Sequence, residues 1–456
     1  MEAKQTSVPD ATSALLVKLN AFKPEHRRDA FIQLAATMGL PNPSANFNMH
    51  CHSFFSYNAN GWSPSRIAYE CRKQGLYAAA LCDFDVLDGL AEFSEAGRLL
   101  GLRTATHLET RAYVRELNTM DISSPGEPGV SYIMGCGFIT VPLPTTAQGF
   151  MLAQLRQGAQ DRNLALISRV NAALPVIAIN YTQDVLPLTP NGVATERHII
   201  RAYCAKVQKV FADLDARAAF WAPLLKCAVS AFAPLEQQSA KMEDLVRNAL
   251  AKRGGIGYIQ PDDKTFPLAE AFIDWVHDCH AIPTIAWLDG TSNGEADCNQ
   301  LLDLMISKGC AALNIIPDRN WNIKDPQEAI RKQSNLTSVI NAARQRALPI
   351  NIGTEMNKAG VPFVDDISGP VLSRYAETFI MGMQIMVGQT VLGTYAQAPY
   401  LGARAEAEFK DLNKRNNFYA SIGALPPLTT ARAIELTEAG PERAFTMLAD
   451  ALKKNA

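Results

Sequence analysis

The sequence predicts an α/β fold whose strands close into a barrel, with a helical insertion and a helical extension at each end. Short β-rich runs alternate with helix-patterned segments from residue 46 to residue 360, a succession typical of parallel α/β folds. Seven or eight such runs are present, enough to close a barrel. A segment rich in Ala, Leu, Lys and Arg interrupts the alternation over about 148–254, and its periodicity is helical.

The first 45 residues are expected to form a helical extension, because apolar side chains recur there at helical spacing. These positions are Leu15, Leu16, Leu19, Phe31, Ile32 and Leu34. The prolines of Pro41-Asn42-Pro43-Ser44 indicate a linker. A barrel domain is therefore expected over 46–360.

The barrel domain supplies the candidate strands, with helix-patterned sequence after most of them. The expected strands are 47–53, 77–84, 102–114, 132–138, 257–260, 282–289, 311–316 and 348–355. Ser63 and Pro64 are suited to cap and begin the helix after the first strand. Residues 361–456 are expected to form a C-terminal helical extension that packs on the barrel, since 406–416 and 442–454 are amphipathic.

Composition narrows the class of partner and the compartment. The formal net charge of −2 gives no basic field for nucleic acid. The nine cysteines are scattered without a Cys-x-x-Cys pair, which disfavours a zinc knuckle or a disulfide framework. The uncharged stretch 378–403 contains several polar residues and is expected to be a buried helix, not a membrane span. With no leader pattern at the N-terminus, we expect a cytoplasmic protein that binds a small molecule, and its oligomeric state is left open.

The most informative motif is His50-Cys51-His52 at the end of the first expected strand. Residues i and i+2 of a strand share a face, so the two imidazoles can reach one metal ion. Catalytic groups of a parallel barrel gather at the carboxyl ends of its strands. Polar side chains at the other strand ends are Asp83, Asp85, His107, Glu109, Asp289, Glu355 and Asn357. Imidazole and carboxylate ligands suit zinc, manganese or iron.

Two stretches carry a family resemblance. Asn48-Met49-His50-Cys51-His52-Ser53, continued through Gly61-Trp62-Ser63-Pro64, and Gly75 to Leu90 around Asp83-Phe84-Asp85 resemble the opening of the PHP (polymerase and histidinol phosphatase) superfamily of metal-dependent phosphoesterases. The similarity is close over 47–110 and is limited to isolated motifs over 130–360. It implies a distorted, TIM-like (β/α)7 barrel, the PHP fold, that holds up to three metal ions.

Carried over residue by residue, the resemblance implies an incomplete set of ligands. The implied metal ligands are His50, His52, Glu109, His198 and Glu355. Five further positions differ from ligands that the family uses: Tyr57, Phe84, Tyr132, Trp287 and Asn357. A phenylalanine cannot ligate and an asparagine is a weak ligand, so one of the three metal sites is predicted to be absent. One or two divalent ions, of zinc, manganese or iron, are expected.

Other polar residues are candidates for binding and catalysis. Arg111, Arg197 and Asn357 are expected to contact an anionic substrate. Arg319 is expected at the catalytic centre, although an ion pair with Asp318 or Asp325 would explain it equally well. Asp289 is a candidate general base or replacement ligand, and equally a helix cap. Three further residues, Asp83, Asp85 and His107, are candidates to orient a ligating histidine.

The function that these observations favour is metal-dependent hydrolysis. The resemblance implies a phosphoesterase that acts on a small phosphorylated metabolite through a metal-activated water. Two alternatives are left open by the substituted ligands. One is a single-metal hydrolase or lyase for a non-phosphorylated substrate such as a carbohydrate derivative, and the other is a barrel with a decayed site that binds a ligand without turnover.

Overall fold

The computed structural model describes residues 11–39 and 41–455. At its centre is a seven-stranded sheet whose strands lie side by side in chain order. The strands are β1 (Phe47–Cys51), β2 (Ala78–Phe84), β3 (Arg103–Tyr113), β4 (Val130–Cys136), β5 (Ile282–Trp287), β6 (Ala312–Ile315) and β7 (Ile350–Ile352). A parallel bridge between Cys51 and Glu355 joins the two ends of the sheet into a nearly closed barrel. The predicted α/β barrel is confirmed.

Two details of the strand prediction are wrong. β4 runs antiparallel to both β3 and β5, whereas all other neighbours are parallel. The reason at β3 is the short connection, which holds only the 3₁₀ turn Arg115–Leu117 and no crossover helix such as parallel strands need. The expected strand 257–260 is irregular, because the backbone N–H of Gly257 donates to Leu250 O at 2.8 Å and ties this segment to the insertion.

Helices surround the barrel and connect its strands. They are α3 (Pro64–Lys73), α4 (Leu90–Leu100), α10 (Ala269–Asp278), α11 (Cys298–Ser307), α12 (Asp318–Trp321) and α13 (Pro326–Gln345). Ser63 caps α3 as expected, since its Oγ accepts from the N–H of Arg66 at 3.1 Å and Pro64 begins the helix. The cavity at the carboxyl ends of the parallel strands is lined by Asp318 and Arg319 of α12 and, opposite the strands, by residues of the insertion.

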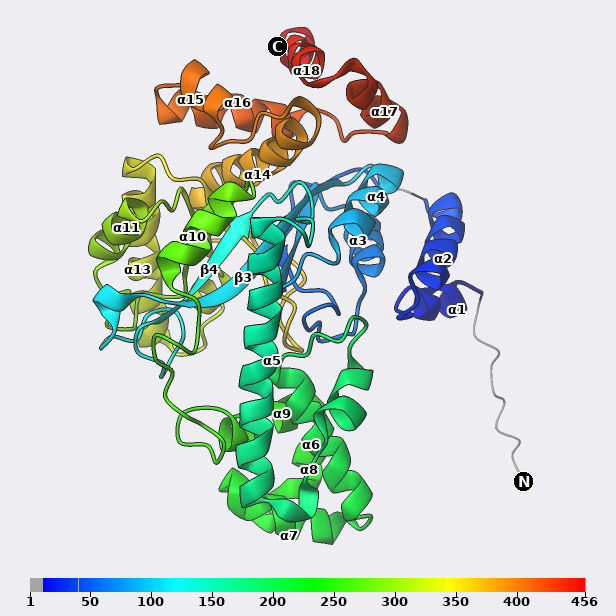
Figure 1. The fold of residues 1–456 in the computed structure, drawn as a ribbon, viewed down its shortest axis with the longest axis vertical. Helices are drawn as coiled ribbons and strands as arrows, with labels where there is room; N and C mark the ends of the chain where they lie inside the picture. The colour runs from blue at the N-terminus through cyan, green and yellow to red at the C-terminus, as the bar shows by residue number, and fades with distance from the viewer. Residues whose placement is uncertain (1–10, 40, 456) are drawn as a thin grey trace.

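The insertion is a helical lobe with its own core. It comprises α5 (Ala147–Ala173), α6 (Glu196–Val210), α7 (Leu214–Leu225), α8 (Phe232–Glu236) and α9 (Ser239–Leu250). Figure 1 shows the long α5 running from the barrel into this lobe. Buried Val170, Tyr203, Trp221 and Phe232 belong to one apolar cluster within it. The lobe thus forms a separate layer over the mouth of the barrel.

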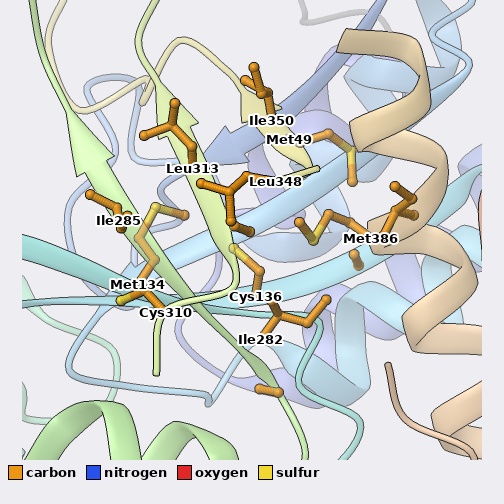
Figure 2. Packing of buried hydrophobic residues seen from close by; sticks show 14 of the residues in the cluster. Met49, Met134, Cys136, Ile282, Ile285, Cys310, Leu313, Leu348, Ile350 and Met386 are labelled. Atoms are coloured by element: carbon orange, nitrogen blue, oxygen red, sulfur yellow. The ribbon is translucent and has the colours of Figure 1, made fainter. Parts of the chain in front are cut away.

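In the described chain, helices precede β1 and follow β7. The extensions consist of α1 (Ala11–Lys18) and α2 (Pro24–Thr37) before β1, and α14 (Ala376–Ala396), α15 (Ala403–Glu408), α16 (Leu412–Ala424), α17 (Thr430–Ala439) and α18 (Pro441–Asn455) after β7. Figure 2 shows Met386 of α14 in the same buried cluster as Met49, Leu313 and Ile350 of the barrel strands. The uncharged stretch therefore forms a buried helix, as predicted.

No single helix within 11–39 and 41–455 is long and apolar enough to cross a membrane. The helices Leu214–Leu225 and Val229–Glu236 meet the length and composition criteria only as a pair, and their axes bend by 110° at the break between them.

Candidate metal centre

His50 and His52 are completely buried and point at one carboxylate. The Nε2 atoms of His50 and His52 lie 3.6 and 3.5 Å from the same oxygen, Oε2 of Glu109. All three atoms are buried and lack a hydrogen-bond partner among the described residues. The two distances exceed those of good hydrogen bonds, but they come close to the spacing of about 3.3–3.4 Å between ligands of a tetrahedral ion bound at about 2.0–2.1 Å. The arrangement therefore fits a shared cation.

The other ring nitrogen of each histidine is held so that Nε2 keeps its lone pair. Nδ1 of His50 faces Oδ1 of Asn314 at 3.4 Å, and this amide oxygen can only accept. Nδ1 of His52 faces Oγ of Ser56 at 3.2 Å, and Ser56 donates its own proton to Oδ1 of Asp83 at 2.6 Å. Both Nδ1 atoms therefore carry the proton, which leaves Nε2 free to bind a metal.

Two overlapping sets of side chains could hold the ion. One ligand atom each of His50, His52 and Glu355 lies within 4.8 Å of the others, and the same is true of His50, Cys82 and Glu109. Glu355 follows β7 with a φ of +64°, and Met356 follows with +59°. Left-handed backbone at two successive non-glycine residues is uncommon, and such strain concentrates at functional sites. The local backbone is thus constrained where Glu355 enters the site.

The charges of the site are strongly coupled. Burial alone would lower the pKa of His50, but the negative charges of Glu109 and Glu355 outweigh it and raise that pKa. Burial, together with the positive charges of His50 and Arg197, holds the pKa of His52 well below its usual value. Burial raises the pKa of Glu109 as well, so a divalent cation at this centre would compete with protons for the histidines and for Glu109.

A cavity of about 1040 Å³ separates this centre from the insertion. Glu109 and Glu355 line it, together with four residues that the sequence predicted near the substrate: Arg111, Arg197, Arg319 and Asn357. The five substituted positions line it too: Tyr57, Phe84, Tyr132, Trp287 and Asn357. Phe84 stacks on the ring of His52 with centroids 4.5 Å apart and an angle of 19°. The cavity thus has an aromatic wall beside the metal ligands.

The arginines differ in how fully they are paired. Arg111 forms an ion pair with Glu127 at 2.8 Å, and Arg197 pairs with Asp244 of α9 at 3.3 Å. Arg319 lies 3.5 Å from Glu355, and 43% of its side chain is exposed. Of the three, Arg319 combines the longest ion-pair contact with direct contact to a proposed metal ligand.

Comparisons with known proteins give distant matches. No family model and no curated protein matches the chain significantly. One solved structure, a protein of Bifidobacterium adolescentis assigned as a metal-dependent phosphoesterase, has 20% identity and a TM-score of 0.46, covering 73% of this chain and 98% of that one. Another, an amidohydrolase of Chromobacterium violaceum with bound sulfate and no metal, has 16% identity and a TM-score of 0.47, covering 73% and 96%.

Two predicted site residues lie apart from the centre. His198 caps α6, where its Nδ1 accepts from the N–H of Thr195 at 3.1 Å, and no candidate ligand set in the described chain includes it. Asp289 is absent from the cavity wall within the described ranges, and its carboxylate pairs with Lys332 at 2.9 Å and accepts from the N–H of Thr291 at 3.0 Å. The structure does not bring either side chain to the histidines.

The three residues predicted to orient ligands lie around the centre. Asp83, besides its bond to Ser56, accepts from the N–H and Oγ of Ser53 at 2.7 and 2.6 Å. Asp85 accepts from Thr110 at 2.6 Å, and its backbone N–H donates to Glu109 O at 3.1 Å. These contacts connect Asp83 to the ring of His52 and Asp85 to the backbone of Glu109.

His107 is placed as a hydrogen-bond donor and not as a ligand through Nε2. Its Nδ1 accepts from the N–H of Gly137 at 3.0 Å, so Nε2 carries the proton. Burial and the nearby charge of His50 lower the pKa of His107 to about 3. The ring of His107 is therefore neutral, and its buried Nε2–H has no hydrogen-bond partner among the described residues.

Sequence reasoning missed a buried amide network behind His50. Asn314 also accepts from Asn351 Nδ2 at 2.8 Å, and Asn351 in turn donates to Met49 O at 3.1 Å. Asn48 accepts from the N–H groups of His50 and Thr354 at 3.1 and 3.2 Å. The available signal was an asparagine within each of three apolar strand runs, because a buried polar side chain needs a partner.

Glu295 was also missed. Only 1% of this residue is exposed, and its carboxylate accepts from the backbone N–H groups of Leu288, Asp289 and Gly290 at 2.7, 3.2 and 3.0 Å. Burial raises its pKa to about 7 in spite of these three hydrogen bonds. Glu295, and not Asp289, is thus the buried acid at the end of β5, where it holds the loop after Trp287.

Proposed function

We propose that this protein is a metal-dependent hydrolase and that its substrates are phosphate esters of small metabolites. The observation that carries the proposal is the convergence of three of the buried, unpartnered atoms in the described chain: Nε2 of His50, Nε2 of His52 and Oε2 of Glu109. Leaving three such groups unpaired is costly, and a cation satisfies all three at once. Their chemistry is that of a zinc, manganese or iron site.

A divalent ion held there would lower the pKa of a bound water and polarise a phosphoryl or carbonyl oxygen. The side chains of this protein would both hold such an ion and orient its ligands. His50, His52 and Glu109 hold the ion, while Asn314 and the Ser56–Asp83 pair fix the histidine tautomers. Half-buried Phe84 and buried Trp287 line the cavity on one side of the site.

Two guanidinium groups support an anionic substrate. Arg319 reaches Glu355, and the charge of Arg197 is close enough to His52 to lower its pKa. Both side chains line the cavity, so a phosphate beside the ion would have donors on two sides. In this proposal Arg319 and Arg197 bind the anion, and Arg111 supports the wall through Glu127.

A substrate without phosphate is the second candidate. Its support is the pairing of the cationic side chains: Arg111 and Arg197 are each already compensated by a carboxylate. Aromatic Tyr132 and Trp287 on the cavity wall would suit a less charged ring, such as that of a carbohydrate derivative.

The test is elemental mass spectrometry of purified protein, with no metal added, for the wild type and for His52→Ala. His277→Ala, at an exposed position on α10, is the matched control. We expect one or two equivalents of zinc, manganese or iron in the wild type and control, and a loss in His52→Ala. A panel of phosphomonoesters, phosphodiesters, carboxylic esters, lactones and amides then separates the two substrate classes. Absence of metal, even after reconstitution, would overturn the proposal.

A further inference from the structure

Cys82 lies at the candidate centre, although no role was predicted for it from the sequence. It lies on β2, fully buried, and shares the inner face of the strand with Ala78 and Ala80, which belong to the same core cluster. Its sulfur and one ligand atom each of His50 and Glu109 all lie within 4.8 Å of one another. Two unpartnered buried atoms, His50 Nε2 and Glu109 Oε2, are directed into the same space in the described chain.

The neighbouring strand offers a contrast. Cys136 on β4 is equally buried, but neither of the ligand sets among the described residues includes it. The two cysteines are alike in residue type and burial, and only Cys82 is close to two ligand atoms. Core filling alone therefore does not account for the position of Cys82.

The spacing is within reach of coordination. For bonds of about 2.0–2.1 Å to nitrogen and about 2.3 Å to sulfur, tetrahedral ligand atoms are about 3.3–3.6 Å apart. The histidine–glutamate contacts of 3.5 and 3.6 Å already meet this spacing. Closing the sulfur from the 4.8 Å limit towards His50 and Glu109 requires a shift of about 1.2 Å at most, which is within the reach of a cysteine side-chain rotation.

Charge balance favours a second anionic ligand. With Glu109 as the one negative ligand, two neutral imidazoles and a divalent ion would leave a buried charge of +1. Glu355 carries the other nearby negative charge, but Arg319 at 3.5 Å compensates it. A thiolate at Cys82, formed when its proton is released to solvent as the ion binds, would make the buried centre neutral.

We propose that Cys82 ligates the ion with His50, His52 and Glu109, and that the centre therefore selects zinc or another thiophilic ion over manganese and magnesium. This inference rests on the proposed function, since it assumes that the site holds metal. Glu355 and Arg319 then stay paired at the cavity and face the substrate. Zinc accommodates one further ligand by becoming five-coordinate, so the centre keeps a position open to the cavity.

Cobalt substitution tests the inference through a spectrum, independently of activity. Cobalt(II) is added to metal-stripped protein, and thiolate ligation gives a near-ultraviolet sulfur-to-cobalt charge-transfer band. We expect the band in the wild type and in Cys136→Ala, and its loss in Cys82→Ser with cobalt still bound. Zinc affinity should fall at least about tenfold in Cys82→Ser, with little change in manganese affinity.

The outcomes separate this inference from the function on which it rests. Wild-type protein that binds one cobalt ion without the band would overturn thiolate ligation and leave the hydrolase proposal intact, whether or not Cys82→Ser folds. A band that persists in Cys82→Ser, or that disappears in Cys136→Ala, would place the thiolate elsewhere. Failure of the wild type to bind cobalt, zinc or manganese would overturn the proposed function itself.

Discussion

Asp83 is predicted to control metal affinity without touching the metal. Its carboxylate is 3% exposed and accepts three hydrogen bonds, from Ser53 N, Ser53 Oγ and Ser56 Oγ. The bond from Ser56 commits that hydroxyl proton, so the serine oxygen accepts from Nδ1 of His52. In Asp83→Ala the hydroxyl is free to donate to Nδ1 instead. The proton of His52 then moves to Nε2, and the metal loses a ligand.

The expected magnitudes differ between two variants. Asp83→Ala leaves three buried donors without a partner, at about 1–3 kcal/mol each, and rotation of the two hydroxyls reduces the total loss to about 3–5 kcal/mol. Asp83→Asn keeps an amide oxygen for Ser53 N and Ser56, so its loss should be about 1 kcal/mol. Loss of such supporting bonds lowers metal affinity about 10–100-fold, and we expect Asn at the low end and Ala at the high end.

Affinity is measured by competition with a chromophoric chelator, and stability by urea unfolding of metal-free protein. Asp303→Asn is the control, because Asp303 is exposed and pairs with Arg346 on another face of the protein. The reasoning is refuted if folded Asp83→Ala binds metal as tightly as the wild type, since the tautomer of His52 would then not depend on Asp83.

Three further predictions address other parts of the site. The pKa of Glu295 is raised from 4.5 to about 7, so the folded protein keeps a proton that the unfolded chain loses. Glu295 should thus contribute a fall of up to about 3 kcal/mol in the free energy of unfolding as pH rises from 4.5 to 7, and denaturation across that range should show a slope reduced by that amount in Glu295→Gln. Arg319→Ala should raise KM for an anionic substrate about tenfold or more with metal content unchanged; an unaltered KM would remove Arg319 from the binding site. In Gly353→Ala the new Cβ would lie 2.6 Å from Cβ of His50, so elemental analysis should find reduced metal, whereas exposed Gly39→Ala, with open space around the new Cβ, should retain it.

The parts of the fold that follow from local pattern were predictable. Seven of the eight expected strands are present, because β-rich runs and the helices between them leave short-range signals. The antiparallel direction of β4 leaves no such signal in the sequence, since it depends on the absence of a crossover helix after β3. The segment 257–260 resembles a strand in composition, but its backbone bonds to the end of α9.

In the site, too, the features set by local sequence were predictable and those set by contacts between distant segments were not. The pairing of His50 and His52 follows from strand alternation over three residues. The side chains that fix their tautomers come from elsewhere: Asn314 lies 264 residues after His50, and Asp83 lies 31 residues after His52. Single asparagines and serines are too common for one sequence to mark them as partners. Which of them contact the histidines is determined by how distant strands pack together, and the periodicity of the sequence does not reveal it.

Positions at which the family resemblance implied a metal ligand, but at which this chain has another residue, take up packing roles around the one well-formed centre. Phe84 stacks on His52 and restricts its ring, which is a packing role that a ligating side chain would not fill. Tyr57 donates to Glu243 of α9 at 3.0 Å, and the guanidinium of Arg201 lies 4.8 Å from its ring centre, so this position joins the barrel to the insertion. A site that has merely decayed would be expected to retain neither a fixed tautomer at both histidines nor a stacked aromatic beside them. The substitutions therefore support a centre concentrated on His50, His52 and Glu109 and enclosed by the insertion.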